Sequence, residues 1–346
     1  MNKFDFSEDQ KEKMGIWRVA NISTKEHGTQ SKNRKTGESV YHSHIIPKTK
    51  WIETVWKDIR KDLSDYLENP EIGVKAHTGT HNLLSSWVVC ANLYFILRNN
   101  ESLKQLMLKF LQEKVSNQIV EIIDIQLEFA FPEGDKLHPS FLLGEKDGSR
   151  GSGQTSPDVA FKVKTINGDG IILTECKYTE HSFYSCSARK IDNESTRINN
   201  PDPDRCMKQV KDCDYSSVCH QSVWGRKYLS LLKISEFGKT KLGRCPAATA
   251  GYQLLRQQAL AEGIAQNGRY NFVASTVAFD IRNADLKGCL RTTGIDDFQT
   301  GWGKLFAGKS IFKTWTHQEW VQFVRDNQVN GEFNEWLGYL NKRYGY

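Results

Sequence analysis

Three residues have the types and spacing that suit phosphodiester hydrolysis, namely Asp158, Glu175 and Lys177. Asp158 follows Pro157, and the other two residues flank Cys176 in Thr-Glu-Cys-Lys. Mg²⁺ in proteins is usually bound by one or two carboxylates together with waters and phosphate oxygens. A lysine beside the metal can orient or deprotonate the attacking water and neutralise the charge that develops on phosphate. The three residues therefore predict a Mg²⁺-dependent site, at which Mn²⁺ can substitute.

The segments around these residues predict a β-hairpin. Residues 159–164 alternate apolar and basic side chains, residues 167–170 (Asn-Gly-Asp-Gly) are typical of a tight turn, and residues 171–176 are a strand. Antiparallel pairing across this turn would bring the head of the first strand to the end of the second. We therefore expect the carboxylates of Asp158 and Glu175 to lie close together.

The strand geometry also predicts where Lys177 and the backbone carbonyl of Cys176 lie. Glu175 and Lys177 are two residues apart on a strand, so their side chains point to the same face. The backbone carbonyl of Cys176, between them, is a further candidate metal ligand. The pattern is short enough to occur by chance, and the alternative is a surface hairpin with a Glu–Lys ion pair. The Pro-Asp pairs at Pro201 and Pro203 lack a following Asp/Glu-x-Lys before the next predicted helix.

The remaining apolar patterns predict an α/β fold, a small mixed β-sheet flanked by helices with an N-terminal helical elaboration. We expect helices over residues 51–67, 82–97 and 247–266, another capped by Asn100, and buried strands over residues 119–131 and 271–281. Residues 21–50 are polar and basic, without an apolar period, and favour a loop or arm. The aromatic residues after Thr300 indicate two short helices, whose rings we expect to pack in the core.

Three regions follow from these elements. Residues 1–117 form an arm and a helical region packed on the core. Residues 118–285 form the core itself, interrupted by a polar excursion over residues 179–245. Residues 286–346 form a C-terminal helical extension.

Composition narrows the class of protein. The 346 residues are 38% hydrophobic and 25% charged, which is ordinary globular composition, and the formal net charge of +6 suits a polyanionic partner without requiring one. The start of the chain lacks the apolar stretch of a secretory signal, and the longest apolar stretch, residues 83–97, is too short and polar to span a membrane. With eight cysteines and no signal, we expect a cytoplasmic protein with free thiols or metal ligands.

Ser-Pro-Asp followed by Thr-Glu-Cys-Lys-Tyr resembles the PD-(D/E)xK nuclease superfamily, which has the restriction-endonuclease-like fold. Other features resemble one restriction-endonuclease-like branch of it, and their order strengthens the resemblance. They are His44-Ile45-Ile46-Pro47, His81-Asn82-Leu83-Leu84-Ser85-Ser86 followed by Asn92, Glu128 in Leu-Glu-Phe, Glu175-Cys176-Lys177-Tyr178-Thr179-Glu180, and Tyr252-Gln253-Leu254-Leu255-Arg256. One departure is Trp87, where the branch would place a glutamine.

The resemblance implies a DNA endonuclease and two further site residues. Glu128, at the end of a predicted strand, would join Asp158 and Glu175 as a metal ligand. Gln253, on a predicted helix, would position water or phosphate. The alternatives are an outward-facing strand glutamate and a solvated helix face. A restriction-like or defence endonuclease is the leading interpretation, a repair or recombination nuclease is another, and cutting both strands would suggest a homodimer.

The cysteines of the polar excursion admit a second metal site. Cys186, Cys206, Cys213 and Cys219 could hold Zn²⁺ or an iron–sulfur cluster, which would order a segment with little core of its own. Their spacings lack the close pair of a zinc knuckle, and all four follow Lys177, unlike the cysteines of cluster-bearing RecB-type nucleases. Buried thiols without metal are the alternative.

A non-catalytic DNA-binding protein of the same fold, with or without such a metal, is the rival from another class. Basic residues in 25–50 and 189–244 could contact phosphates in either case, although acidic residues are interspersed among them.

Overall fold

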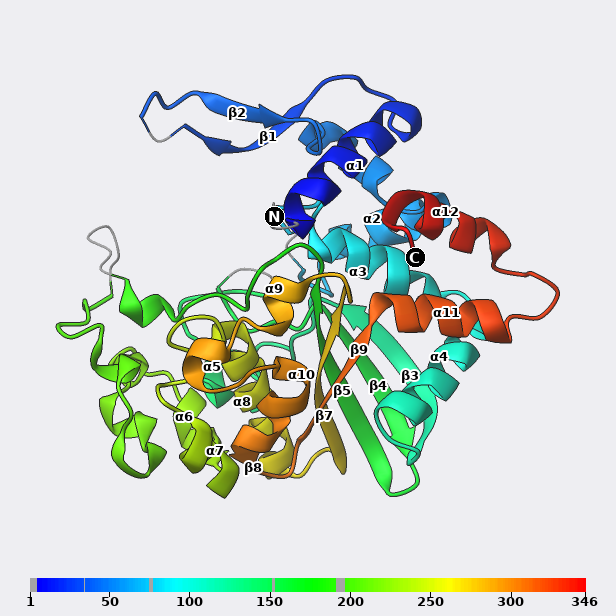
Figure 1. Cartoon of the computed structure of the whole chain (residues 1–346). Helices are drawn as coiled ribbons and strands as arrows, with labels where there is room; N and C mark the ends of the chain where they lie inside the picture. Colours follow the sequence, from blue (N-terminus) through cyan, green and yellow to red (C-terminus); the bar gives the residue numbers. More distant parts are fainter. Residues whose placement is uncertain (1–4, 34, 75–76, 151–152, 191–196) are drawn as a thin grey trace.

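The computed structural model describes residues 5–33, 35–74, 77–150, 153–190 and 197–346. Its centre is a five-stranded mixed sheet in the order β3-β4-β5-β7-β9 (Figure 1). β3, β4 and β5 pair antiparallel, whereas β7 pairs parallel with both β5 and β9. Helices cover both faces of this sheet. The expected fold class, a small mixed sheet flanked by helices as in restriction endonucleases, is confirmed.

The strands of the main sheet are β3 (Ile119–Leu127), β4 (Val159–Thr165), β5 (Gly168–Lys177), β7 (Phe272–Phe279) and β9 (Ile311–Thr316). Two small sheets are formed by β1 (Gly28–Lys32) with β2 (Ser39–His42), and by β6 (Lys233–Ile234) with β8 (Phe306–Ala307). The helices are α1 (Phe6–Asn21), α2 (Arg60–Glu68), α3 (Ser86–Tyr94), α4 (Glu101–Lys114), α5 (Pro139–Leu142), α6 (Tyr228–Leu231), α7 (Glu236–Lys241), α8 (Tyr252–Asn267), α9 (Ala284–Lys287), α10 (Phe298–Gly301), α11 (His317–Asn327) and α12 (Asn334–Tyr344).

Short 3₁₀ helices occupy many of the connections. They are η1 (Lys48–Thr54), η2 (Lys57–Ile59), η3 (Phe95–Arg98), η4 (Ser187–Arg189), η5 (Arg205–Met207), η6 (Lys211–Cys213), η7 (Tyr215–Val218), η8 (His220–Ser222), η9 (Arg291–Thr293) and η10 (Trp302–Leu305). Among the described residues, no helix is both long enough and apolar enough to cross a membrane.

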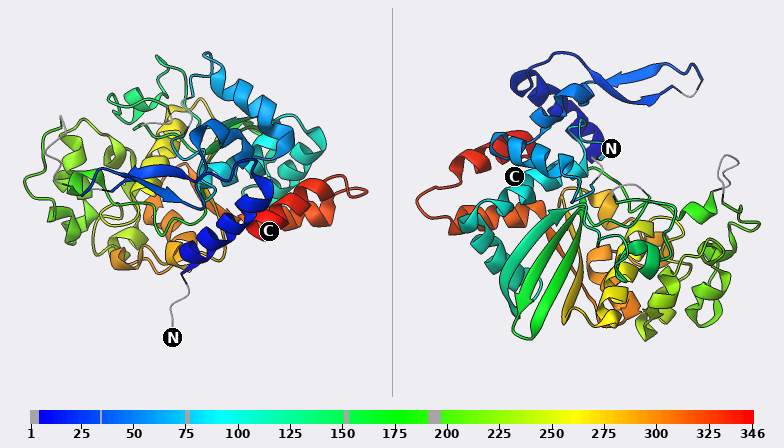
Figure 2. Two further views of the ribbon diagram at one scale, coloured as in Figure 1. Left: turned by 90° about the horizontal axis from the view of Figure 1, so that it is seen from above. Right: turned by 180° about the vertical axis from the view of Figure 1, so that it is seen from behind.

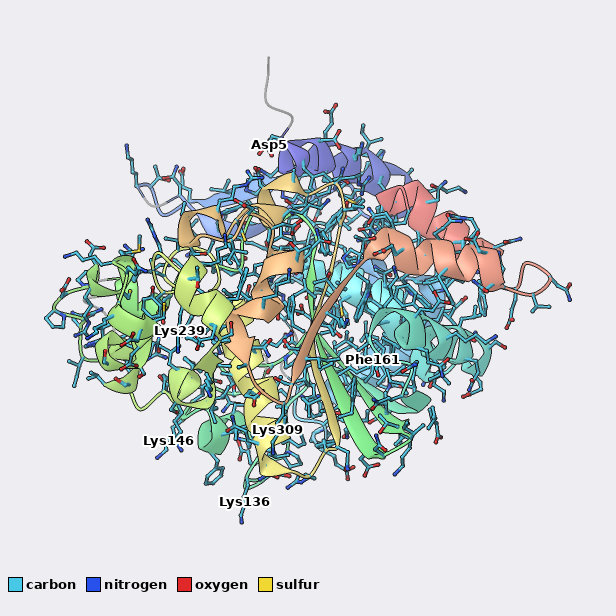
Figure 3. The ribbon with its side chains drawn as sticks, turned by 60° about the horizontal axis from the view of Figure 1, so that its bottom comes forward. Asp5, Lys136, Lys146, Phe161, Lys239 and Lys309 are labelled. Carbon is cyan, nitrogen blue, oxygen red and sulfur yellow. The ribbon has the colours of Figure 1, made fainter. Side chains whose placement is uncertain are left out.

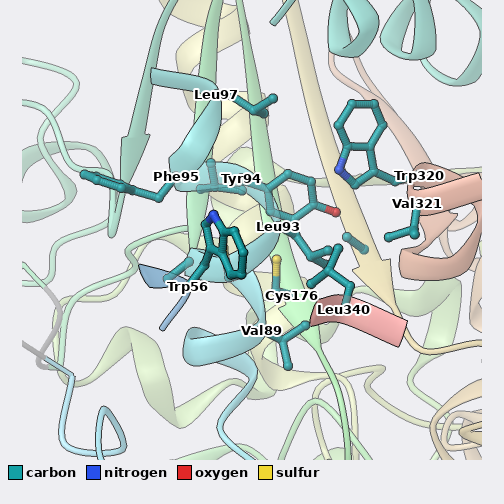
Figure 4. Close-up of a cluster of buried hydrophobic side chains, with 14 of the residues drawn as sticks. Trp56, Val89, Leu93, Tyr94, Phe95, Leu97, Cys176, Trp320, Val321 and Leu340 are labelled. Atoms are coloured by element: carbon teal, nitrogen blue, oxygen red, sulfur yellow. The ribbon is translucent and has the colours of Figure 1, made fainter. Parts of the chain in front are cut away.

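Alternation along β5 divides the core into two clusters, one on each face of the sheet. Ile172 and Cys176 pack with α3, α4, α11 and α12, whereas Ile171 and Leu173 pack with α8 and α10. Figure 4 shows the first cluster, with Cys176 lying near Tyr94 and Leu340. Because Glu175 and Lys177 share the parity of Ile171 and Leu173, the charged pair points to the α8 face.

The side-chain distribution agrees with this division. Phe161 is fully buried on β4 and meets the ring of Tyr94 at 6.0 Å. The lysines Lys136 and Lys146, by contrast, point outward from the loops near α5 (Figure 3). Buried strands of a sheet covered on both faces contain almost continuous apolar runs, as in residues 171–173.

The predicted helices and strands are largely confirmed, with shifted ends. Residues 167–170 were expected to form the hairpin turn, but the turn is one pair earlier, because Thr165 pairs with Gly168 and leaves Ile166 and Asn167 as its central residues. Asn100 caps α4 as expected, by accepting a hydrogen bond from the Leu103 backbone N–H.

Three expectations need correction. Residues 21–50 contain the β1–β2 hairpin rather than only loop, and this arm projects from the rest of the molecule (Figure 2). Residues 51–67 are not one helix, since η1 and η2 precede α2. The expected helical extension at residues 286–346 contributes β9 to the main sheet. The aromatic spacing after Thr300 resembled helix, and strand β9 is short and lies at the sheet edge, which weakens its pattern.

Asn92 ties segments from both ends of the chain to α3. Its Oδ1 accepts from the backbone N–H of Trp56 at 2.7 Å, and its Nδ2 donates to the Tyr344 hydroxyl at 3.0 Å and to the Thr54 carbonyl at 3.2 Å. The side chain is fully buried. Asn92 therefore joins α3 to η1, to the Trp56 backbone between η1 and η2, and to α12.

We predict that Asn92→Ala lowers the free energy of unfolding by about 2–4 kcal/mol, because it leaves several buried polar groups unpaired. Urea unfolding followed by fluorescence measures the change. Asn327→Ala is the matched control, since that side chain is exposed on α11, and we expect less than about 0.5 kcal/mol there. Equal losses in the two variants would contradict the role given to Asn92.

Candidate nuclease site

The register of the β4–β5 hairpin brings the two predicted carboxylates together. Val159 pairs with Thr174, so Asp158 lies opposite Glu175 at the next position. Asp158 Oδ2 also accepts a hydrogen bond from the backbone N–H of Cys176 at 2.7 Å. Since the N–H and C=O of one strand residue point to the same side, the Cys176 carbonyl also faces β4. The predicted convergence of these residues is confirmed.

Glu175 and Lys177 form a buried ion pair on the α8 face of the sheet. Lys177 Nζ lies 2.8 Å from Glu175 Oε1, and the two side chains are 3% and 10% exposed. A surface Glu–Lys pair, the alternative considered from sequence, is therefore ruled out. A buried pair gains little net stability because desolvation offsets its attraction, so its burial is better explained by a chemical role.

Burial and neighbouring charge set the protonation of this pair. Burial lowers the pKa of Lys177, but the carboxylates of Glu175, Glu180 and Asp158 more than offset this, so the net pKa of the ammonium is raised. Lys177 Nζ also lies 5.9 Å from the ring of Phe183. The lysine is thus held as a cation, which suits charge stabilisation and water orientation better than proton abstraction.

The acidic residues of the site repel one another. Burial raises the pKa of Asp158 well above its usual range, and the charge of Glu175 raises it further. Burial, and then the charge of Glu175, likewise raise the pKa of Glu128 to about 8. Three carboxylates in low dielectric cannot all be ionised without a compensating cation. This is the electrostatic condition that a bound divalent cation relieves.

Glu128 is held in an unusual backbone conformation. It has φ +47°, in the left-handed region that non-glycine residues rarely adopt, directly after β3. Its backbone N–H donates to the Asp158 carbonyl at 3.0 Å, and the guanidinium of Arg150 donates to the carbonyls of Glu128 and Leu127. Such strain, about 1–3 kcal/mol, clusters at functional sites. Glu128 lies close behind Asp158 and Glu175.

The site opens into a cleft of about 710 Å³ built from four parts of the chain. Its lining includes Asp158, Glu175, Lys177, Glu180, Tyr184 and Gln253 from the core, Ser7 and Lys11 of α1, Gln30, His44 and Lys48 of the arm region, and His77, Asn82, Ser85 and Ser86 before α3. Glu128 does not line the cleft.

Several lining residues were not expected at the site from sequence. Tyr184 has φ +55° and its ring lies 5.7 Å from Lys177 Nζ, but no motif marks it. His77 also lines the cleft; burial lowers its pKa, and the charges of Glu180 and Lys177 act on it. Glu180 lines the cleft, whereas the neighbouring His181 is exposed outside it.

The polar side chains of α8 have two roles: some line the cleft, and others join the helix to the rest of the fold. Gln253 lines the cleft, and its buried Oε1 has no hydrogen-bond partner among the described residues. Gln257 donates to the Leu173 and Thr276 carbonyls, which joins α8 to the sheet. Arg256 donates to Glu145, which is fully buried. Only Gln253 of this face is thus free to act on a substrate.

Trp87, the departure from the resembling branch, is an apolar core residue at 1% exposure. The other residues before and at the start of α3, Ser85 and Ser86, line the cleft. The helix therefore meets the site through its N-terminal end rather than through the position of Trp87.

The predicted four-cysteine group is only partly assembled. Cys186, Cys206 and Cys219 line one cavity, but the fourth cysteine there is Cys245. Cys213 is elsewhere, with its sulfur 3.5 Å from the Lys239 carbonyl. The spacing of cysteines along an irregular segment does not show which of them meet at the cavity, because the chain returns to the cavity only at residue 245.

Several arginines of the excursion are structural. Arg189 donates to the Pro203 and Ala248 carbonyls, and Arg226 donates to the Gly144 carbonyl and to Asp147. These contacts use the guanidinium groups within the fold, as clamps between loops. The arm differs, since neither Lys32 nor Lys35 has an ion-pair partner among the described residues. The residue between them, Arg34, lies outside the described residues.

The donor set at the cleft fits a hard divalent cation. Asp158, Glu175 and the Cys176 carbonyl offer oxygen ligands, and one or two carboxylates plus waters suffice for Mg²⁺. As the side chains stand in the described parts of the chain, no three His, Cys, Asp or Glu residues close around a single ion.

A family model described as restriction endonuclease associating with ARP matches residues 11–345. No curated protein and no solved structure matches the chain. The matched region includes the arm, the sheet, the excursion and the C-terminal helices, and of the residues that line the cleft only Ser7 lies outside it.

We predict that, without metal, Glu128 contributes a fall in the free energy of unfolding as pH rises from about 4.5 to about 8, against the opposite contributions of His44, His77 and His317, whose pKa values burial lowers. Over that range the unfolded chain loses a proton that native Glu128 retains, since its pKa is raised from 4.5 to about 8. The slope for one group is at most about 1.4 kcal/mol per pH unit. Urea unfolding in EDTA at several pH values measures it.

Glu128→Gln should remove this part of the slope, whereas the exposed Glu332→Gln should keep it. An unchanged pH dependence in Glu128→Gln would show that the raised pKa is assigned to the wrong group.

Proposed function

The chain belongs to the family described as restriction endonuclease associating with ARP, and from this premise we propose that it is a Mg²⁺-dependent endodeoxyribonuclease of the PD-(D/E)xK type. The observation that carries the proposal is the convergence of Asp158, Glu175 and Lys177 in one cleft, with the lysine paired to Glu175 at 2.8 Å. Restriction or defence against foreign DNA is the role that the family favours.

The residues of the cleft divide the work of in-line hydrolysis. Asp158, Glu175 and the Cys176 carbonyl would hold Mg²⁺, with Glu128 supporting them from behind. When bound, Mg²⁺ supplies Lewis-acid activation of the phosphate and lowers the pKa of a coordinated water. Lys177 would orient the attacking water and stabilise negative charge on the phosphate as its raised pKa keeps it protonated.

Gln253 lines the same cleft as Lys177. Its unpaired Oε1 can accept a hydrogen bond from a water, which would fix the direction of that water toward the phosphate. A buried amide oxygen without a partner costs free energy in the absence of substrate, as is common for groups that act only in the complex.

The arm would supply DNA contacts beside the site. Its base is fastened to the turn before α3, since Asn82 Nδ2 donates to Gln30 Oε1 at 2.8 Å and Gln30 Nε2 donates to the Thr78 carbonyl at 3.3 Å. From there β1 and β2 extend outward with exposed lysines (Figure 2). A two-stranded ribbon fits the major groove of duplex DNA, and lysines bind its phosphates.

We predict that the protein nicks or linearises supercoiled plasmid with Mg²⁺ or Mn²⁺ and not with EDTA. Lys177→Met should lower the rate about 10²-fold or more, because charge stabilisation at the phosphate is lost. Gel electrophoresis of plasmid over time measures the rate.

Lys164→Met is the matched control for this measurement. Lys164 lies on the same hairpin but pairs with Asp169 near the turn, so its variant should cut at the rate of the unmodified protein. Cleavage that persists in Lys177→Met or in EDTA would refute the site assignment. DNA binding without cleavage in any metal would favour the non-catalytic alternative.

We predict that the double variant Lys32→Ala/Lys35→Ala binds duplex DNA more weakly and with a smaller salt dependence. Removing two phosphate contacts should reduce the slope of log K against log salt by about 2. Fluorescence anisotropy with a labelled duplex in Ca²⁺ measures both quantities.

The control is Lys309→Ala/Lys313→Ala, two exposed lysines near the start of β9, of which Lys309 lies far from the arm in Figure 3. Equal effects of the two pairs would mean that the arm contributes only general charge.

A further inference from the structure

Four cysteines that the nuclease site does not use surround one small enclosed cavity. Cys186 precedes η4, Cys206 lies in η5, Cys219 joins η7 to η8, and Cys245 lies shortly before α8. All four line a cavity of about 20 Å³, and all are free thiols. Residues so far apart in the sequence meet here only because the excursion folds back on the start of α8.

The thiols are close enough to affect one another. Burial raises the pKa of Cys245 well above its usual range, and the charges of Cys206, Cys219 and Cys186 raise it further. The same holds in turn for Cys186 beside Cys219, and for Cys206 beside Cys186. Backbone contacts support the group, since the Cys245 N–H donates to the Cys206 carbonyl at 3.0 Å.

Polar side chains face these sulfurs inside an otherwise apolar cluster. Gln221, 3% exposed, donates from Nε2 to Cys186 Sγ at 3.2 Å. Tyr215 lines the same cavity at 1% exposure, and its hydroxyl has no hydrogen-bond partner in the described part of the chain. A buried donor without an acceptor is unfavourable. A thiolate in the cavity would accept such a hydrogen bond, whereas a buried thiol is a poor acceptor.

We propose that Cys186, Cys206, Cys219 and Cys245 bind a metal centre through four thiolates. Four cysteine sulfurs are the usual ligand set for structural Zn²⁺, and also for iron–sulfur clusters. The cavity has room for about one water-sized sphere, which favours a single ion. In the described parts of the chain no three of these sulfurs are grouped closely enough to hold an ion, so binding would require the four side chains to turn toward one point. Each thiol releases its proton as it coordinates.

The site would fasten the excursion beside the nuclease cleft. The segment from Phe183 to Cys186 already hydrogen-bonds to the start of α8, because Cys186 N–H donates to the Ala247 carbonyl at 2.9 Å and Gln253 N–H to the Phe183 carbonyl at 2.9 Å. Tyr184 in this segment lines the cleft together with Gln253. A metal that joins Cys186 to Cys245 would therefore hold both cleft residues in position while taking no part in hydrolysis.

The test is metal analysis of the full chain, produced with zinc and iron in the medium and purified without oxygen. We expect about one Zn²⁺ per chain. Iron with acid-labile sulfide and visible absorption would equally support the four-thiolate site and identify a cluster. Absence of both metals would overturn the proposal, whatever the outcome of the plasmid assay.

Single serine variants assign the ligands. We expect Cys245→Ser to lose at least about tenfold in bound metal, and Cys213→Ser, in the same excursion but outside the cavity, to retain it. Equal metal content in the two variants would overturn the assignment.

Because Cys245→Ser could unfold, the unmodified protein provides a second measurement. Treatment with a strong chelator should make the four cavity thiols newly reactive toward a thiol reagent and lower the melting temperature. Unchanged thiol reactivity after chelation would count against the site.

Discussion

The antiparallel register of β4 with β5 is the constraint on which the rest of the structure depends. It places Asp158 opposite Glu175, and the hydrogen bond from the Cys176 N–H to Asp158 holds that alignment at the open end of the hairpin. A slip of one residue would turn Glu175 and Lys177 from the α8 face to the opposite, mainly apolar core. The burial of both charged side chains on the α8 face therefore depends on this register.

Elements that are distant in sequence complete the cleft at the end of the β4–β5 hairpin. The arm and the turn before α3 are joined by backbone and side-chain hydrogen bonds and meet the hairpin across one cleft. The excursion approaches from the other side, where the fully buried Glu145 accepts hydrogen bonds from Thr155, Tyr228 and Arg256. Because segments from most of the chain build the cleft, a family model that matches nearly the whole chain is to be expected.

The carboxylates of the cleft and the four thiols of the small cavity differ as candidate metal ligands. The carboxylates at the cleft are hard ligands with room for water and substrate, as a catalytic cation requires. The four thiols are soft ligands in an enclosed cavity with no room for substrate, as a structural metal requires. They are linked through Gln253 and Tyr184, which lie between them at the start of α8 and in the loop that follows β5.

Local sequence patterns were enough to predict the β4–β5 hairpin, the buried helix α3, the strands β3 and β7, and the convergence of Asp158, Glu175 and Lys177. These depend on local periodicity, turn residues and a spacing of two on a strand, which neighbours in sequence decide. Tertiary structure alone decided that β9 joins the sheet, that Cys245 replaces Cys213, and that His77 and Tyr184 reach the cleft. Those features depend on where distant segments pack against one another, which local sequence patterns do not show.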